Sequence, residues 1–99
     1  MLNIESKKNA AELTVALAGR LDTNTAPELE TALNMSLDGV KTLLIDMEQL
    51  DYISSAGLRV LLAAQKTMNK QGEMKVLHVN ETIMEIFEVT GFSDILTIA

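Results

Sequence analysis

Two adjacent serines, Ser54 and Ser55, are the residues whose type and position could do chemistry in this sequence. They stand between an apolar run and a predicted helix, so a nucleophile, a helix cap and a modification site are all open. A nucleophilic serine needs a base and usually an oxyanion hole. The G-x-S-x-G pattern of a nucleophile elbow is absent, because the residues here are ISSAG. The only histidine, His78, is expected in the middle of a strand, so we predict no enzyme.

Metal and cofactor sites have little support in the residue types. With one histidine and no cysteine, only carboxylates remain as abundant metal ligands. Asp22, Asp46 and Asp51 fall at predicted strand ends or loops and could converge on one edge of a sheet. Three loop aspartates are more typical of solvated turns than of a Mg²⁺ site. No Walker-type or G-x-G-x-x-G loop is present. We therefore predict neither a metal nor a cofactor.

A helix start explains the serine pair in structural terms. Serine is among the preferred N-cap residues, typically worth ~1 kcal/mol over alanine. A serine in the first turn also faces unpaired backbone N–H groups and the positive end of the helix dipole. A phosphate added there would bring about −1.5 to −2 charges and could repel a partner. The position suits a reversible switch that leaves the fold intact.

Length and composition bound the class of protein. The 99 residues predict a single domain spanning 1–99, with 47% apolar residues available for one core. The net charge of −6 argues against a nucleic-acid partner, because a protein that binds nucleic acid needs a clustered basic surface. No apolar run approaches the roughly 18 residues of a membrane span, and no secretory signal is visible. Together with the absence of cysteine, this predicts a cytoplasmic protein without direct membrane insertion.

Periodicity predicts the elements that position the serines. Apolar alternation at residues 2–4 and 13–17 predicts a hairpin. A first helix is expected after Thr25, which can form a capping box with Glu28. The run VKTLLID then predicts a buried central strand. The helix that follows Ser54 and Ser55 is expected to end near Gly72.

The remaining segments complete an alternating pattern. The run MKVLHV predicts another strand, Asn80 caps a third helix that ends at Gly91, and residues 95–98 suggest a short last strand. The order ββαβαβαβ predicts an α/β domain with a mixed, mostly parallel sheet of about five strands and about three helices. The helices are expected to cover mostly one face of the sheet.

These residues resemble a known family. The segment LLIDMEQLDYISSAGLRVLLAAQK resembles the hallmark segment of anti-sigma factor antagonists of the STAS domain family. LAGRLDTNTAPEL is similar to the family's Gly-x-Leu-Asp loop, and GFSDILTI to its C-terminal segment. The resemblance spans essentially all 99 residues. It implies an STAS-like fold and an anti-sigma factor partner that is often also a serine protein kinase. By the same resemblance, phosphorylation of one serine is expected to end the binding, and a phosphatase to restore it.

The resemblance also assigns roles to residues. The family's phosphoacceptor is the serine two residues before the glycine, which corresponds to Ser55 because Gly57 fixes the position. The family commonly has Asp just before the acceptor, whereas this chain has Ser54, which is left as a second acceptor. Asp46 matches the strand-end acid, and Asp22 the loop aspartate implicated in partner or nucleotide contact. The implied partner-binding residues are Asp22, Thr23, Ser54, Ser55, Ala56, Gly57 and Arg59.

Two other functions remain open from the sequence. The same fold serves as an interaction subunit of lipid-trafficking or stress-signalling complexes, sometimes without phosphorylation. It could also act as a nucleotide sensor that makes a weak nucleotide contact through the Asp22 loop and the Ser55 helix start.

Overall fold

The chain begins with the predicted hairpin. In the computed structural model, which describes residues 1–99, β1 (Leu2–Asn9) pairs antiparallel with β2 (Glu12–Leu21) along its whole length. The alternation that predicted the hairpin is also the burial pattern, because Leu13, Val15 and Leu17 are buried while their neighbours are not. Period-two burial is what a strand with one covered face requires.

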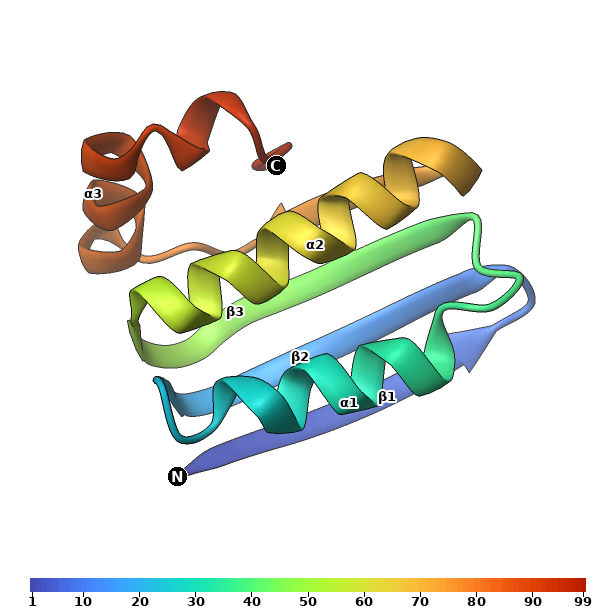
Figure 1. Ribbon diagram of the computed structural model, residues 1–99, viewed down its shortest axis with the longest axis horizontal. Helices are drawn as coiled ribbons and strands as arrows, with labels where there is room; N and C mark the ends of the chain where they lie inside the picture. Colours follow the sequence, from blue (N-terminus) through green and yellow to red (C-terminus); the bar gives the residue numbers. More distant parts are fainter.

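The rest of the sheet is built by parallel crossovers. Helix α1 (Ala26–Ser36) leads to β3 (Thr42–Ile53), and helix α2 (Ser55–Gln71) leads to β4 (Glu73–Leu77). Strand β3 pairs parallel with both β2 and β4, which gives a mixed sheet in the order β1-β2-β3-β4. Figure 1 shows α1 and α2 side by side on the same face of this sheet. The prediction of a mixed, mostly parallel sheet with helices on one face is therefore confirmed.

Strand β3 extends beyond the run VKTLLID that predicted it. It continues to Ile53, and its pairing with β2 shifts register between Ala16 opposite Asp46 and Ala18 opposite Gln49. One residue of β2 thus faces two residues of β3, which is a β-bulge. The bulge interrupts the alternation of burial after Met47, so the second half of this strand lacks the two-residue period by which a strand is recognised in a sequence.

The junction between α2 and β4 is closely packed against the start of β3. Gly72 ends α2, as predicted, and its N–H donates to the Met68 carbonyl at 2.7 Å. A Cβ at Gly72 would overlap the backbone carbonyl of Lys41, with only 2.6 Å to the carbonyl carbon. The next residue, Glu73, donates its N–H to that same carbonyl at 2.9 Å. Glycine is therefore required here by a close approach of two backbone segments.

The prediction of a fifth strand at residues 95–98 is wrong. Helix α3 (Glu81–Thr90) starts at Asn80, whose side chain caps it, and ends at Gly91 as expected. The 3₁₀ helix η1 (Phe92–Asp94) follows at once, so residues 92–94 are not extended. Of residues 95–98, only Ile98 forms a bridge to Val76 of β4. The Val76 N–H donates to the Thr97 carbonyl at 2.9 Å, and the Ala99 N–H donates to the Val76 carbonyl at 3.0 Å. The apolar run that suggested a strand instead places Leu96 in the core.

Candidate functional site

Two loops meet at one edge of the sheet because the strands before them are parallel. Leu21 at the end of β2 pairs with Ile53 at the end of β3, so the residues that follow them emerge together. The Ser54 N–H donates to the Leu21 carbonyl at 2.9 Å and ties the two loops to each other. Figure 1 shows both connections at the end of the sheet where α1 and α2 begin.

The two serines have different roles at the start of α2. Ser54 is the N-cap residue, in extended backbone with φ −99° and ψ 175°, and its Oγ accepts the Gly57 N–H at 3.4 Å. Its carbonyl accepts the Leu58 N–H at 2.9 Å. Ser55 is the first residue of the helix and is exposed. The cap prediction is confirmed for Ser54, and Ser55 presents its side chain to solvent.

Gly57 lies inside the molecule instead of at its surface. It is buried in the first turn of α2, and a Cβ there would come within 2.7 Å of Leu21 Cγ and 2.9 Å of Ile53 Cγ1. The absence of a side chain lets α2 pack directly on the ends of β2 and β3. Gly57 is part of a regular helix, so its small size serves this packing and not the conformational freedom of a turn.

The loop between β2 and α1 is organised by Asp22 and Thr25. Asp22 Oδ1 accepts the N–H groups of Asn24 at 3.0 Å and Thr25 at 3.1 Å. Hydrogen bonds from the Thr25 and Asn24 N–H groups and the Thr25 hydroxyl, with the Arg20 charge, lower the pKa of Asp22 against a smaller opposing effect of desolvation. The carboxylate therefore stays ionised and holds the loop in shape.

Thr25 does not form the predicted capping box. Its Oγ1 accepts the Asp22 N–H at 2.8 Å and donates to the Arg20 carbonyl at 2.8 Å, and it makes no side-chain cap to the helix. The hydroxyl points back into the loop because Asp22 offers it partners there. Thr25 is a buried polar residue that holds the two ends of the Asp22 loop together.

Substitution of Thr25 by valine should destabilise the domain by about 2 kcal/mol, because the Asp22 N–H and Arg20 carbonyl each lose a partner at a buried position. Urea denaturation monitored by circular dichroism measures the change. Thr23→Val is the matched control, since Thr23 is exposed and the same chemical change there should cost little. Equal stabilities of the two variants would contradict the role assigned to the Thr25 hydroxyl.

A groove runs between the first turns of α1 and α2. It has a volume of about 200 Å³ and brings together Thr23, Ala56 and Arg59, three of the residues expected to contact a partner. Pro27 and Glu30 form the α1 side of the groove. Ser55, which directly precedes Ala56 of the groove in α2, is exposed.

Arg20 and Tyr52 are neighbours of the site that sequence reasoning missed. The Arg20 guanidinium carbon lies 4.4 Å from the centre of the Tyr52 ring, and its Nε lies 3.8 Å from Asp22 Oδ2. The two residues are paired across β2 and β3, immediately before Leu21 and Ile53. Only the strand register reveals this contact, which a cation–π interaction stabilises.

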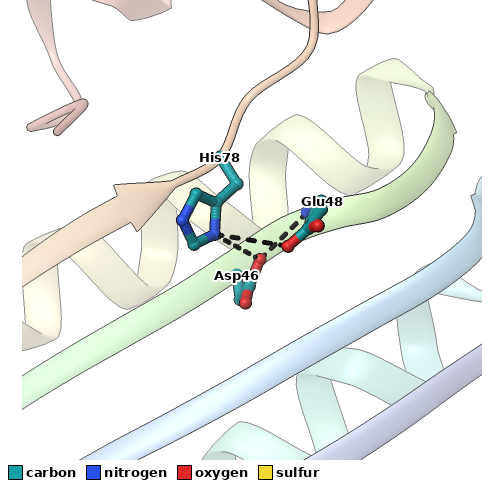
Figure 2. Close-up of side chains that lie close together, drawn as sticks. All are labelled: Asp46, Glu48 and His78. Carbon is teal, nitrogen blue, oxygen red and sulfur yellow. Dashed lines mark hydrogen bonds and ion pairs between the residues drawn. The ribbon is translucent and has the colours of Figure 1, made fainter.

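The three aspartates Asp22, Asp46 and Asp51 do not converge. Asp46 lies within β3, between Ile45 and Met47, which are buried under the helices, so its side chain is on the opposite face of the sheet. There Asp46 Oδ1 lies 3.1 Å from Nδ1 of His78. Figure 2 shows the two side chains facing each other. Asp46 therefore points away from the serine site, which the loops at the strand ends form.

His78 is not in a strand, contrary to prediction. It follows the end of β4 with φ of 56°, an uncommon left-handed conformation for a residue with a side chain. The hydrogen bond and charge of Asp46 raise the pKa of His78, with a smaller contribution from Glu48, against an opposing effect of desolvation. The pKa of Asp46 is lowered, first by the Glu48 N–H and then by His78, again against desolvation.

Comparison with known protein families places the whole chain in one domain type. The family model of the STAS domain matches residues 2–99. The anti-sigma-B factor antagonist of Staphylococcus aureus (strain NCTC 8325 / PS 47) is 34% identical over 97 residues, which cover 96% of this chain and 90% of the relative. None of the helices is both long enough and apolar enough to cross a membrane.

Solved structures share the same architecture. The crystal structure of an anti-sigma factor antagonist from Mycobacterium paratuberculosis is similar with a TM-score of 0.88 and 22% identity, over 99% of this chain and 85% of that one. The Bacillus cell fate determinant SpoIIAA, in its phosphorylated form, is similar with a TM-score of 0.77 and 17% identity, over 98% of this chain and 91% of that one. These likenesses establish the fold.

Proposed function

The chain belongs to the STAS domain family, and from this premise we propose that it is an anti-sigma factor antagonist switched off by phosphorylation of Ser55. The unmodified chain binds an anti-sigma factor that is also a serine protein kinase, and this binding frees a sigma factor. Phosphate on Ser55 ends the association, and a phosphatase restores it. The observation that carries the proposal is the exposed position of Ser55 in the first turn of α2.

The different structural roles of Ser54 and Ser55 support Ser55 as the acceptor. Ser54 is only partly exposed and its oxygen accepts the Gly57 N–H as the helix cap, whereas Ser55 is exposed. Ser55 has no such duty and can be modified without loss of the cap. The family's usual aspartate before the acceptor is replaced here by Ser54, which keeps the capping function of that position.

The fold can accept a phosphate on Ser55 without rearrangement. The start of a helix carries unpaired N–H groups and a positive partial charge, which favour an anion. Arg59 lies four residues further along α2 and is exposed, at a spacing that places it on the same side of the helix as Ser55. Release of the partner then follows from the added charge and bulk at the contact surface, and the domain itself stays folded.

The surface around Ser55 defines where the partner docks. The Asp22 loop and the groove between α1 and α2 flank the serine, and Thr23, Ala56 and Arg59 line that groove. With a net charge of −6, the chain favours a partner that is basic overall. The part of the partner that faces Ser55 is apolar or acidic, so that an added phosphate opposes binding. We propose no catalysis by the chain itself, because its only histidine, His78, is on the other face of the sheet from α2.

Incubation of the chain with its cognate anti-sigma factor kinase and ATP tests the acceptor. Mass spectrometry of the product should place one phosphate on Ser55, and Ser55→Ala should abolish the modification. Ser54→Ala is the matched control, because it removes the neighbouring hydroxyl and costs only the cap, about 1 kcal/mol. Full phosphorylation of the Ser55→Ala protein would overturn the assignment of the switch.

A further inference from the structure

A second cluster of reactive side chains lies away from the serine site. Nδ1 of His78 is 3.1 Å from Asp46 Oδ1 and 3.9 Å from Glu48 Oε2, and the ligand atoms of all three residues lie within 4.8 Å of one another. Figure 2 shows the two carboxylates and the imidazole converging in front of β3. No part of the proposed switch uses these groups.

The backbone builds this convergence in two ways. The bulge in β3 keeps Asp46 and Glu48 together, because Asp46 Oδ1 accepts the Glu48 N–H at 3.0 Å. The parallel register places Leu77 opposite Asp46, and the left-handed backbone of His78 then turns the next side chain back over β3. Residues 32 positions apart in the sequence thus direct their donors to one point.

The donor set has the chemistry of a first-row transition-metal site. Ligand atoms at about 2.0–2.2 Å from such an ion are separated from one another by roughly 3.0–3.5 Å. Nδ1 lies 3.1 and 3.9 Å from the two carboxylates, close to this range, and the exposed Glu48 side chain can rotate toward an ion. One imidazole with two carboxylates suits Zn²⁺ or Mn²⁺, whereas Mg²⁺ and Ca²⁺ prefer sites made of oxygen alone.

We propose that Asp46, Glu48 and His78 bind a divalent transition-metal ion, for which Zn²⁺ is the probe, on the face of the sheet opposite α1 and α2. The ion replaces the direct contact between Nδ1 and the carboxylates, and its remaining coordination positions are open to solvent. The site joins β3 to the segment between β4 and α3, so bound metal also stabilises that connection.

Titration of the untagged chain with Zn²⁺ by calorimetry and NMR tests the site. His78 is the only histidine, so its imidazole signals report directly on binding and should shift on addition of Zn²⁺. His78→Asn and Glu48→Gln should each weaken Zn²⁺ binding by about tenfold or more. Asparagine tolerates the left-handed backbone of residue 78, so that variant removes the imidazole and keeps the turn.

Glu85→Gln on α3 is the control for the loss of one exposed negative charge, and it should leave the affinity for Zn²⁺ unchanged. Titration with Mg²⁺ should leave the imidazole signals in place. The proposal is overturned if Zn²⁺ binds wild type and His78→Asn equally well, or if the imidazole signals do not move. Phosphorylation of Ser55 is measured in a separate experiment, so the result of the Zn²⁺ titration does not decide whether the proposed switch is correct.

Discussion

Replacement of Ser55 by glutamate is expected to weaken binding of the chain to its anti-sigma factor by about a hundredfold or more. Ser55 is exposed in the free chain and lies at the centre of the proposed contact surface, beside the groove between α1 and α2. A charge that becomes buried without a partner in an interface costs about 3–5 kcal/mol, and each 1.4 kcal/mol is a factor of ten in affinity. Surface plasmon resonance with the immobilised anti-sigma factor measures this change.

Ser55→Gln separates charge from size in that experiment. Glutamine has the same length as glutamate and no charge, so its binding should be weakened less than that of the glutamate variant. Circular dichroism spectra and melting temperatures of both variants should match those of the wild type, because the side chain of residue 55 does not take part in the helix cap. Equal affinities of the two variants would show that the added charge does not drive release.

Gly72→Ala is expected to lower the free energy of unfolding by about 3 kcal/mol, as overpacking against a rigid neighbour does. The new methyl group would overlap the Lys41 carbonyl, which is backbone and cannot rotate away. That carbonyl also accepts the Glu73 N–H at the point where β4 joins β3, so the strain spreads into the sheet. For a domain of this size, the melting temperature should fall by more than about 10 °C.

Gly39→Ala is the control for this prediction. Gly39 has φ of 78°, and a methyl group added there would have no neighbouring atom within 4 Å, so alanine meets only backbone strain, about 1–2 kcal/mol. Differential scanning calorimetry should therefore give a larger loss for Gly72→Ala than for Gly39→Ala. A smaller loss at position 72 would mean that the α2–β4 junction yields easily.

Features encoded by neighbouring residues were predictable from the sequence. The hairpin followed from alternation along β1 and β2, and the helix starts at Ser54 and Asn80 followed from cap chemistry that acts within three residues. The placement of Ser55 in the first turn of α2 has the same origin. Local patterns were therefore sufficient to locate the start of α2, whereas the choice of Ser55 as the proposed phosphoacceptor came from the family resemblance.

Features that depend on tertiary partners were not predictable in this way. Thr25 stands where the sequence predicts a helix cap, yet its hydroxyl bonds to the backbone of Asp22 and Arg20 because the loop folds back on itself. His78 meets Asp46 only because β4 pairs with β3 in one register, which a single sequence does not reveal. A methyl group at Gly57 is excluded by nearby Ile53 and by Leu21, which belongs to a distant part of the chain that the local sequence does not reveal.

The hydrogen bond from the Ser54 N–H to the Leu21 carbonyl has a consequence for recognition. A short peptide with the sequence around Ser55 lacks both that bond and the strands below it, and isolated helices of this length are marginal in water. A modifying enzyme that acts on the folded chain therefore meets this serine within a surface assembled from two separate segments, which a linear consensus sequence does not describe.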